Sequence, residues 1–487
     1  MLGRGLVGLT EYGAAEQVQG SSLVIEANSK KYLVDVGSLP PGPIDGLLIT
    51  HAHLDHISRY LDLVSDGFNG PVYAPYQTVD LTELQFIQSI SGQFIHNNWV
   101  NKHNRTLPNE KQLSHQPVRY VFRDLTKAMK HFRDFNGKKG FPYCEQINIS
   151  EDVAATFYDA GHIPGSSQIL FEIKQDDGLT KKILTTGDLG RKDYEKYKDH
   201  PIASDLPFVN PPYDDFSGLD ALVIEATYGN RQHRPLSESI DILEAAIKEA
   251  YDNKGRIVIP AFSIGRTQII KCFYYRMDHL GIIPKGMNLV ASCPTAEEVE
   301  KVMLKHIDEF DLRSKEDFRY PLDNPFKNPH LIKHKKMQET WELIHQRDYT
   351  PYIILASSAM GDMGRSRTIL RETISDPKTI VLKTSYAAPG TPMWMIKKGF
   401  QTIPFDLVGE VENNAKFYNM GGLSGHADVD EINNFIRKID PERKLKKIFL
   451  KHGEKKSCFD LRETIIQRLG YNPDTVVVMK KGERYEV

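Results

Sequence analysis

Five short apolar segments of this chain run directly into a histidine or an acidic residue. Each segment is rich in β-branched and other apolar side chains, which is typical of buried strands. The segments are residues 46–50 before His51, 155–161 before His162, 182–187 before Asp188, 222–224 before Glu225 and 447–451 before His452. Ligands of open α/β sheets gather where strands end and loops begin. The pattern therefore predicts one polar site assembled from five strand ends.

The densest of these ends is residues 50–56, which read THAHLDH. A tight loop after a strand can aim His51 and His53 at one metal ion, while Asp55 and His56 turn toward a second. Imidazole and carboxylate ligands without thiolates suit zinc, with manganese or iron as alternatives. A lone histidine at a strand end is more often a capping or packing residue, but that reading does not account for the whole run.

Strand-like and helix-like segments alternate along the chain, which predicts an α/β protein. Helices are expected over residues 237–253, over 295–310 with a capping box from Thr295 to Glu298, and from Asp428 onward. Residues 91–150 are polar and weakly periodic, so we expect a long excursion there with a short helix near 124–132.

Composition limits the class of protein. A chain of 487 residues exceeds one compact core, so two or three domains are expected. The net charge is −2, so a nucleic-acid site would need a local basic groove. Four widely separated cysteines predict free thiols and a cytoplasmic protein. No signal peptide is expected, and no apolar run reaches membrane-spanning length, so no membrane association is expected.

Eight ordered motifs resemble those of a known family. Four resemble motifs of the metallo-β-lactamase fold: THAHLDH (50–56), GHIPGSS (161–167), TTGDLGR (185–191) and KHGE (451–454). Four more resemble motifs of its β-CASP branch, which contains nucleic-acid-processing nucleases: EATYG (225–229), PAFSIGRTQ (260–268), SSAMGDMGRS (357–366) and GGLSGHAD (421–428).

The resemblance implies an αββα metallo-β-lactamase sandwich interrupted by an α/β β-CASP domain. The sandwich would comprise residues 1–233 and 406–487, and the inserted domain residues 234–405.

The resemblance also implies a ligand set for two zinc ions. One ion would be bound by His51, His53 and His162, the other by Asp55, His56 and His452, with Asp188 bridging both. Asp35 would orient the histidine loop without touching a metal. Glu225 and His426 would form a pair beside the scissile phosphate, so the expected catalytic residues are Asp55, Asp188, Glu225 and His426.

Two metal ions about 3.5–4 Å apart can activate a shared water as hydroxide and neutralise charge on a phosphodiester. His426, kept protonated by Glu225, could donate a proton to the leaving oxygen. Further phosphate contacts are predicted where small residues and arginines follow strands, although helix capping and surface charge are alternatives. These candidates are Arg266, Ser357, Ser358 and Arg365.

The leading hypothesis is a zinc-dependent ribonuclease acting on single-stranded RNA. His452 stands where RNA-directed members of the family have histidine, which favours RNA over DNA. A DNA nuclease, a non-nucleolytic metallo-hydrolase and an inactive scaffold subunit of an RNA-processing complex are the alternatives. The sequence leaves endonuclease and 5′-exonuclease action open, together with assembly as a homodimer or within an RNA-processing complex.

Overall fold

The computed structural model describes residues 7–105, 114–115, 117–192, 200–203, 206–318, 324–346, 350–405 and 409–487. The chain divides into two compact units. The first contains residues 1–191, 211–232 and 426–487, and the second contains residues 192–210 and 233–425.

The first unit contains two large β-sheets. The strands of one sheet are, in order, β23 (Arg484–Glu486), β1 (Gly8–Glu11), β2 (Leu23–Ala27), β3 (Lys30–Val34), β4 (Gly46–Leu48) and β5 (Val72–Tyr73). The strands of the other are β22 (Val476–Val478), β21 (Lys447–Lys451), β12 (Ala221–Glu225), β11 (Thr180–Thr185), β10 (Ser167–Lys174), β9 (Val153–Asp159) and β8 (Gln146–Asn148).

Alternating side chains explain how these sheets form a sandwich. In β10, Ile169 and Phe171 join a buried cluster that also contains Leu23 and Ile25 from the facing sheet. Leu170 points the opposite way, into a second cluster formed with helices. This two-residue period buries both faces of β10. The core of the first unit therefore has one layer between the sheets and another between a sheet and its helices.

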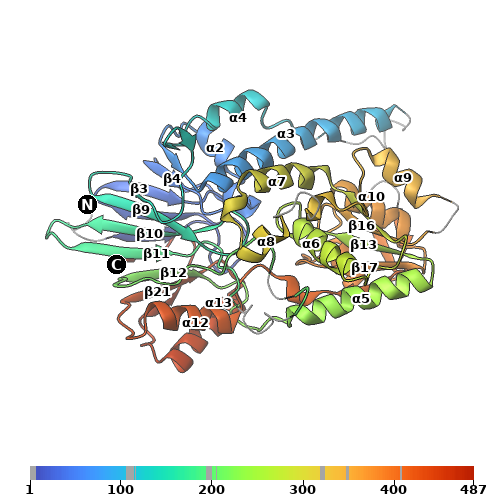
Figure 1. Cartoon of the computed structure of the whole chain (residues 1–487). Coiled ribbons are helices and arrows are strands. Elements are labelled where there is room, and N and C mark those ends of the chain that lie inside the picture. The colour runs from blue at the N-terminus through green and yellow to red at the C-terminus, as the bar shows by residue number, and fades with distance from the viewer. Residues whose placement is uncertain are drawn as a thin grey trace. The chain divides into compact units, whose positions relative to one another are not determined.

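Helices cover the outer faces of the two sheets (Figure 1). Helices α12 (Val429–Ile439) and α13 (Lys455–Thr464) pack on the sheet that contains β10. Near the other sheet lie α1 (Leu54–Ile57), α2 (Tyr60–Ser65), α3 (Tyr76–Asn104), α4 (Phe122–Ala128) and the hairpin of β6 (Asp134–Phe135) and β7 (Lys138–Lys139). The predicted αββα order is confirmed.

The second unit is built on a parallel sheet. Its strand order is β15 (Leu331–Lys333), β14 (Asn288–Ser292), β16 (Tyr352–Ala356), β13 (Arg256–Pro260), β17 (Thr379–Lys383) and β20 (Lys416–Asn419). Strand β20 lies beyond residue 405, where the sequence ended the inserted domain. The sequence-based domain limits stay predictions.

Helices cover both faces of this sheet, which explains its uninterrupted apolar strands. In β13, Ile257 and Ile259 face a cluster with α5 and α6, while Val258 faces a cluster with α10 and α11. The helices of the unit are α5 (Leu236–Asp252), α6 (Arg266–His279), α7 (Pro294–Lys305), α8 (Leu312–Asp317), α9 (Met337–Ile344), α10 (Gly364–Thr373) and α11 (Pro392–Lys397). A short hairpin joins β18 (Thr402–Phe405) and β19 (Gly409–Glu412).

Two local expectations need correction. The capping box from Thr295 to Glu298 is wrong, because the N-cap of α7 is Cys293 and Pro294 occupies the first turn. Proline is preorganised for that position, so the helix begins before the threonine. Helix α3 also continues to residue 104, well into the expected excursion. Much of its last part is partly or fully exposed, which explains its weak apolar periodicity.

Other local expectations hold. Asp428 caps α12, since its carboxylate accepts hydrogen bonds from the backbone N–H groups of Asp430 and Glu431. The four cysteines have free thiols. Among the described helices, none is long and apolar enough to cross a membrane.

Candidate metal centre

The predicted ligands come from strand ends at one edge of the first unit. Strands β11, β12 and β21 are parallel neighbours, so their carboxyl ends lie side by side. Asp188 follows β11, Glu225 ends β12 and His452 follows β21. Strand β9 runs in the same direction as β11, because both are antiparallel to β10, and it leads to His162. The sheet order thus brings these side chains together.

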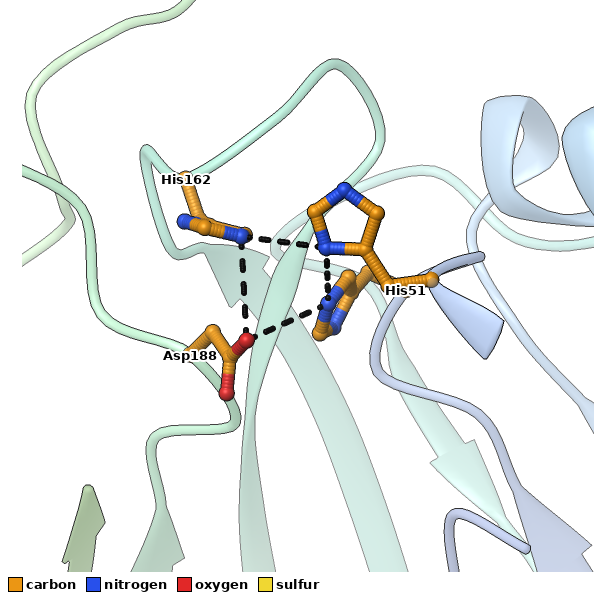
Figure 2. Close-up of side chains that lie close together, drawn as sticks. His51, His162 and Asp188 are labelled. Carbon is orange, nitrogen blue, oxygen red and sulfur yellow. Dashed lines mark hydrogen bonds and ion pairs between the residues drawn. The ribbon is translucent and has the colours of Figure 1, made fainter. Parts of the chain in front are cut away.

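The first cluster joins three imidazole nitrogens and one carboxylate oxygen (Figure 2). His53 Nδ1 lies 3.1 Å from His51 Nε2 and 3.2 Å from His162 Nε2. Asp188 Oδ2 lies 3.4 Å from His51 Nε2 and 3.6 Å from His162 Nε2. All four atoms therefore converge on one point.

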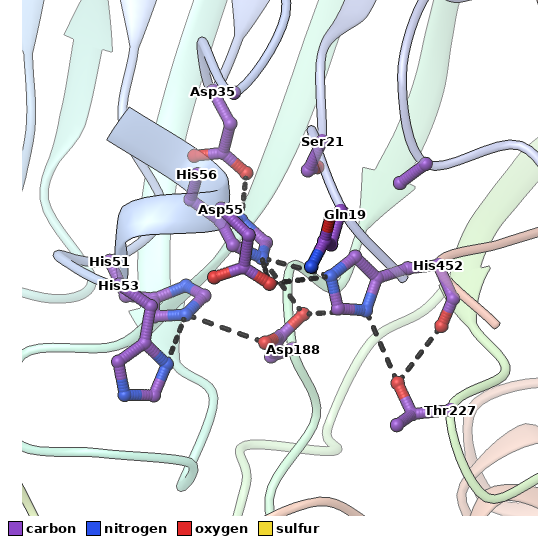
Figure 3. A network of polar contacts seen from close by, with 12 residues as sticks. Gln19, Ser21, Asp35, His51, His53, Asp55, His56, Asp188, Thr227 and His452 are labelled. Atoms are coloured by element: carbon purple, nitrogen blue, oxygen red, sulfur yellow. Dashed lines mark hydrogen bonds and ion pairs between the residues drawn. The ribbon is translucent and has the colours of Figure 1, made fainter. Parts of the chain in front are cut away.

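The second cluster lies on the other side of the same carboxylate (Figure 3). His56 Nε2 is 3.2 Å from His452 Nε2 and 3.3 Å from Asp188 Oδ1. Asp55 Oδ2 is 3.4 Å from His452 Nε2. Asp188 thus directs one oxygen at each cluster, as a bridging carboxylate would.

These spacings fit metal binding. A tetrahedral ion with bonds of about 2.0–2.1 Å separates its ligand atoms by about 3.3–3.4 Å, close to the separations in both clusters. Asp188 Oδ1 is buried and accepts no well-aligned hydrogen bond from the described residues, although His56 Nε2 and His452 Nδ1 lie 3.3 Å from it. A cation held among these atoms would satisfy the carboxylate oxygen.

Protonation in the first cluster suits metal binding as well. Burial lowers the pKa of His51 and of His162, and it lowers the pKa of His53 to about 3. Neutral imidazoles keep a nitrogen lone pair available for a metal. Burial raises the pKa of Asp188, but the nearby His452, His56 and His51 lower it by more than burial raises it. The pKa of Asp188 is therefore well below its usual range. The carboxylate is therefore ionised.

Hydrogen bonds from neighbouring residues fix the orientation of three of the histidine rings. Asp35 Oδ2 accepts a hydrogen bond from His56 Nδ1 at 2.7 Å, and Thr50 holds Asp35 through its backbone N–H and its hydroxyl. The Thr50 hydroxyl also lies 3.1 Å from His51 Nδ1. The Thr227 hydroxyl lies 3.2 Å from His452 Nδ1. For His51 and His56 the contact engages the ring nitrogen that faces away from the clusters, whereas His452 Nδ1 also lies 3.3 Å from Asp188 Oδ1.

Glu225 and His426 form the pair that the sequence predicted. The Glu225 side chain is fully buried, and its Oε1 accepts from His426 Nδ1 at 2.9 Å and from the Leu189 backbone N–H at 2.7 Å. The His426 ring lies 4.4 Å from the His162 ring, centroid to centroid. Burial lowers the pKa of His426, but Glu225 and Asp188 raise it to about 10. The imidazole is therefore protonated at neutral pH.

Two regions of the chain match models of known domains. Residues 269–396 match the model of the Beta-Casp domain, and residues 410–477 match that of the Zn-dependent metallo-hydrolase RNA specificity domain. Both matches are similarities to β-CASP proteins of the metallo-β-lactamase fold. The resemblance and the fold expected from the sequence are confirmed.

Several curated proteins align with nearly the whole chain. The transcription termination factor FttA of Methanosarcina mazei is 26% identical over 95% of this chain and 69% of its own length. FttA of Thermococcus kodakarensis is 27% identical over 95% of this chain and 69% of its own length. Ribonuclease TTHA0252 of Thermus thermophilus is 26% identical over 94% of this chain and 96% of its own length.

A crystal structure of a protein of unknown function from Enterococcus faecalis also resembles this chain. The similarity covers 99% of this chain and 100% of the other chain, with a TM-score of 0.52 at 12% sequence identity. At this identity the likeness shows the fold alone.

The four predicted phosphate contacts lie in the second unit. Arg266 begins α6 after β13, and Ser357 and Ser358 follow β16, all at the carboxyl edge of the parallel sheet. The Ser358 hydroxyl donates to Asp362 Oδ1 at 2.9 Å. Arg365 donates to Ser292 Oγ at 3.1 Å and to the carbonyl oxygen of His334 at 2.7 Å. These bonds hold the Arg365 side chain against its own unit. Phosphate binding by the four predicted residues stays a prediction.

Sequence reasoning missed a buried ion pair beside His452. Lys451 Nζ donates to Glu11 Oε2 at 2.7 Å, and both side chains are almost completely buried. Glu11 Oε1 accepts from the backbone N–H of Ala14, whose carbonyl oxygen accepts from the His452 backbone N–H at 2.6 Å. The only sequence signal was one charged residue at the end of each of two apolar strands.

Removing the shared carboxylate tests the two-cluster arrangement. We expect Asp188→Ala to lose metal from both clusters, because each would lose one ligand. Metal analysis of the purified protein measures the loss, with Asp176→Ala, an exposed aspartate, as the control. Full metal content in Asp188→Ala would show that Asp188 is not a bridging ligand.

Breaking the buried ion pair tests the support of His452. Glu11→Ala leaves the Lys451 ammonium buried without its counter-charge, which should lower the free energy of unfolding by about 3–5 kcal/mol. Lys31→Ala, at the exposed pair with Glu26, should cost about 0–1 kcal/mol. Chemical denaturation of both variants measures the difference, and equal costs would contradict the assigned role.

Proposed function

We propose that this protein is a zinc-dependent ribonuclease that hydrolyses phosphodiester bonds of RNA. The observation that carries the proposal is the position of Asp188, which directs one oxygen into each of two histidine-containing clusters. The donor set contains no thiolate and suits zinc, with manganese as an alternative. When bound, a pair of such ions would supply Lewis acidity toward water and toward a phosphodiester.

The residues of the chain would act around that pair. His51, His53 and His162 would hold one ion, and Asp55, His56 and His452 the other, with Asp188 shared and Asp35 orienting His56. The hydrogen bonds that orient the His51 and His56 rings limit reorganisation during the reaction. Asp55 and Asp188 would also keep the site anionic enough to retain two dications.

The pair of Glu225 and His426 supports a role in proton transfer. Glu225 is buried and accepts three hydrogen bonds, one of them from His426. This anchoring fixes the position of the imidazole and keeps a proton on it. The His426 side chain is 19% exposed, so its exposed edge can reach a substrate. We infer that His426 contacts the phosphate and donates a proton to the leaving oxygen.

Three observations favour RNA over DNA and over a small ester. Residues 410–477 match a domain described as conferring RNA specificity in Zn-dependent metallo-hydrolases. A relative that aligns over 96% of its own length carries the name ribonuclease. A histidine also stands at position 452, where RNA-directed members of the family have one. A DNA nuclease of the same family is the second candidate.

An inactive scaffold subunit is a poorer fit. All seven predicted ligands are present, and all belong to the first unit. FttA proteins are longer than this chain, which covers 69% of the two aligned above. We assign RNA cleavage before any role in transcription, because the clustered ligands suit hydrolysis and a relative aligned over 94% of this chain carries the name ribonuclease. A homodimer or an RNA-processing complex stays a prediction.

Replacing His426 separates metal binding from catalysis. His426→Ala should retain its metal but slow RNA cleavage by about 10²–10⁴-fold, the usual contribution of a general acid. Single-turnover cleavage and metal analysis on the same sample measure both effects. His345→Ala, a surface histidine of the second unit, serves as the control. Loss of metal from His426→Ala would contradict its role in proton transfer.

Matched oligonucleotides test the substrate class. A 5′-labelled single-stranded RNA should be cut, and the DNA of the same sequence should be cut far more slowly. Chelation should abolish cleavage and added zinc should restore it. Internal fragments would identify an endonuclease, whereas release of single labelled nucleotides would identify a 5′-exonuclease. Faster cutting of the DNA, or cutting that survives chelation, would refute the proposed function.

A further inference from the structure

A strongly basic segment lies on the first unit, away from the metal ligands in sequence. Residues 119–139 contain seven lysines and arginines but only two acidic residues, in a chain whose net charge is −2. We use the name basic surface for the exposed side chains of Arg119, Arg123, Lys127, Lys130, Lys138 and Lys139.

Helix α4 and the turn that follows it place half of the basic surface on one side. Arg123, Lys127 and Lys130 are spaced by four and three residues, the spacing of neighbours on a helical face. Leu125 and Ala128 point into the protein and are buried. The one acidic residue of α4, Asp124, accepts a hydrogen bond from the Val121 backbone N–H at 3.0 Å and is thus occupied by capping.

The hairpin of β6 and β7 brings the other lysines to the end of that helix. Lys139 Nζ donates to the carbonyl oxygen of Met129 at 2.8 Å, directly before Lys130. Lys138 Nζ lies 3.7 Å from the centre of the Tyr76 ring. These contacts hold the hairpin against α3 and α4 and gather the cations into one surface.

The three cations of α4 and its following turn are not neutralised by neighbouring carboxylates. On other helices, exposed lysines pair with acids one turn away, as Lys248 does with Asp252 and Lys456 with Asp460. Arg123, Lys127 and Lys130 form no ion pair with any residue that the structure describes. Like charges at this spacing repel each other and oppose helix formation. An anionic ligand would relieve the repulsion.

Exposed apolar side chains lie beside the cations and narrow the choice of anion. Val118, Val121 and Phe122 are 45%, 38% and 49% exposed. Single-stranded nucleic acid combines a row of phosphates with flat, unpaired bases that stack on aromatic side chains. Its chemistry therefore matches both components of the surface, whereas a simple anion would leave the apolar side chains exposed.

The basic surface is connected to the metal centre by direct packing. The Tyr60 hydroxyl donates to the carbonyl oxygen of Ala128, in α4, at 2.6 Å. Tyr60 begins α2, one helical turn after the predicted ligand His56. The metal centre and the cations of α4 thus belong to neighbouring parts of the same unit. One RNA strand could bind at both.

We propose that the basic surface binds the backbone of single-stranded RNA outside the metal centre, with Phe122 stacking on a base. The proposal rests on the proposed ribonuclease function, and it extends that function to a second contact region. Such a region adds affinity for long RNA, but it contributes nothing to a substrate too short to reach it.

The test compares charge reversal at two places. One variant carries Arg123→Glu, Lys127→Glu and Lys130→Glu. Its control carries Lys30→Glu, Lys174→Glu and Lys285→Glu, three exposed lysines with the same total change in charge. Both sets are made in the His426→Ala protein, so that binding is measured without rapid cleavage. Thermal unfolding confirms that each variant is folded.

The probes are fluorescent single-stranded RNAs of about thirty and about six nucleotides, titrated by anisotropy at several salt concentrations. For the long RNA, reversal of the three charges should weaken binding about tenfold or more. The slope of log affinity against log salt should fall by about 0.7 for each phosphate that the variant no longer neutralises, or about two in all. The short RNA and the control variant should show no such change.

Unchanged affinity and slope for the long RNA would overturn the proposal. So would a variant that binds RNA normally but loses binding to vesicles of anionic phospholipid, because the surface would then serve a membrane. Failure of the parent protein to bind or cleave any RNA would instead refute the ribonuclease assignment. Normal RNA cleavage by the protein with intact His426, together with no effect of charge reversal on binding of the long RNA, would refute only the basic surface.

Discussion

The arrangement of the metal centre depends on one buried carboxylate, Asp188. Its two oxygens point into different clusters, so neither cluster is complete without it. The position of Asp188 depends in turn on the sheet order. Strand β11 lies between β10 and β12, and its end therefore lies between the end of β9 on one side and that of β21 on the other. Strand order in this unit is thus a chemical constraint as well as a topological one.

A buried cluster of this kind carries a cost that the fold must offset. Asp35 and His452 both have left-handed backbone angles, with φ of 60° and 53°, which non-glycine residues adopt at a cost of about 1–3 kcal/mol. Hydrogen bonds hold both conformations in place, from Thr50 to the Asp35 carboxylate and from the His452 backbone to Ala14. Of these two strained residues, Asp35 orients the His56 ring and His452 is itself a predicted ligand. Strain at such positions is expected where a binding site must be rigid.

The sequence singled out the candidate metal ligands because they follow strands directly, and the structure brings these side chains into two clusters. A strand end fixes where the next side chain lies, and His, Asp and Glu are uncommon after buried apolar runs. Supporting residues such as Thr50, Thr227 and the Glu11–Lys451 pair lacked this signal. Their partners lie up to 440 residues away, and the hydrogen bonds between them exist only in the folded chain. The start of α7 was missed for a local reason, because Pro294 outweighs a nearby capping motif.

The proposed metal centre and the proposed RNA-binding surface would separate catalysis from affinity electrostatically. A net charge of −2 provides no general attraction for a polyanion, so RNA must be recognised where cations are concentrated. The metal centre is rich in carboxylates and would attract phosphate only once its ions are bound. The basic surface around α4 has the opposite property, since its cations are permanent and all of them except Arg119 lack an ion-pair partner among the described residues. A long RNA could therefore be held before the reaction begins, with a salt dependence set by the surface, while the rate of cleavage is set by the buried site.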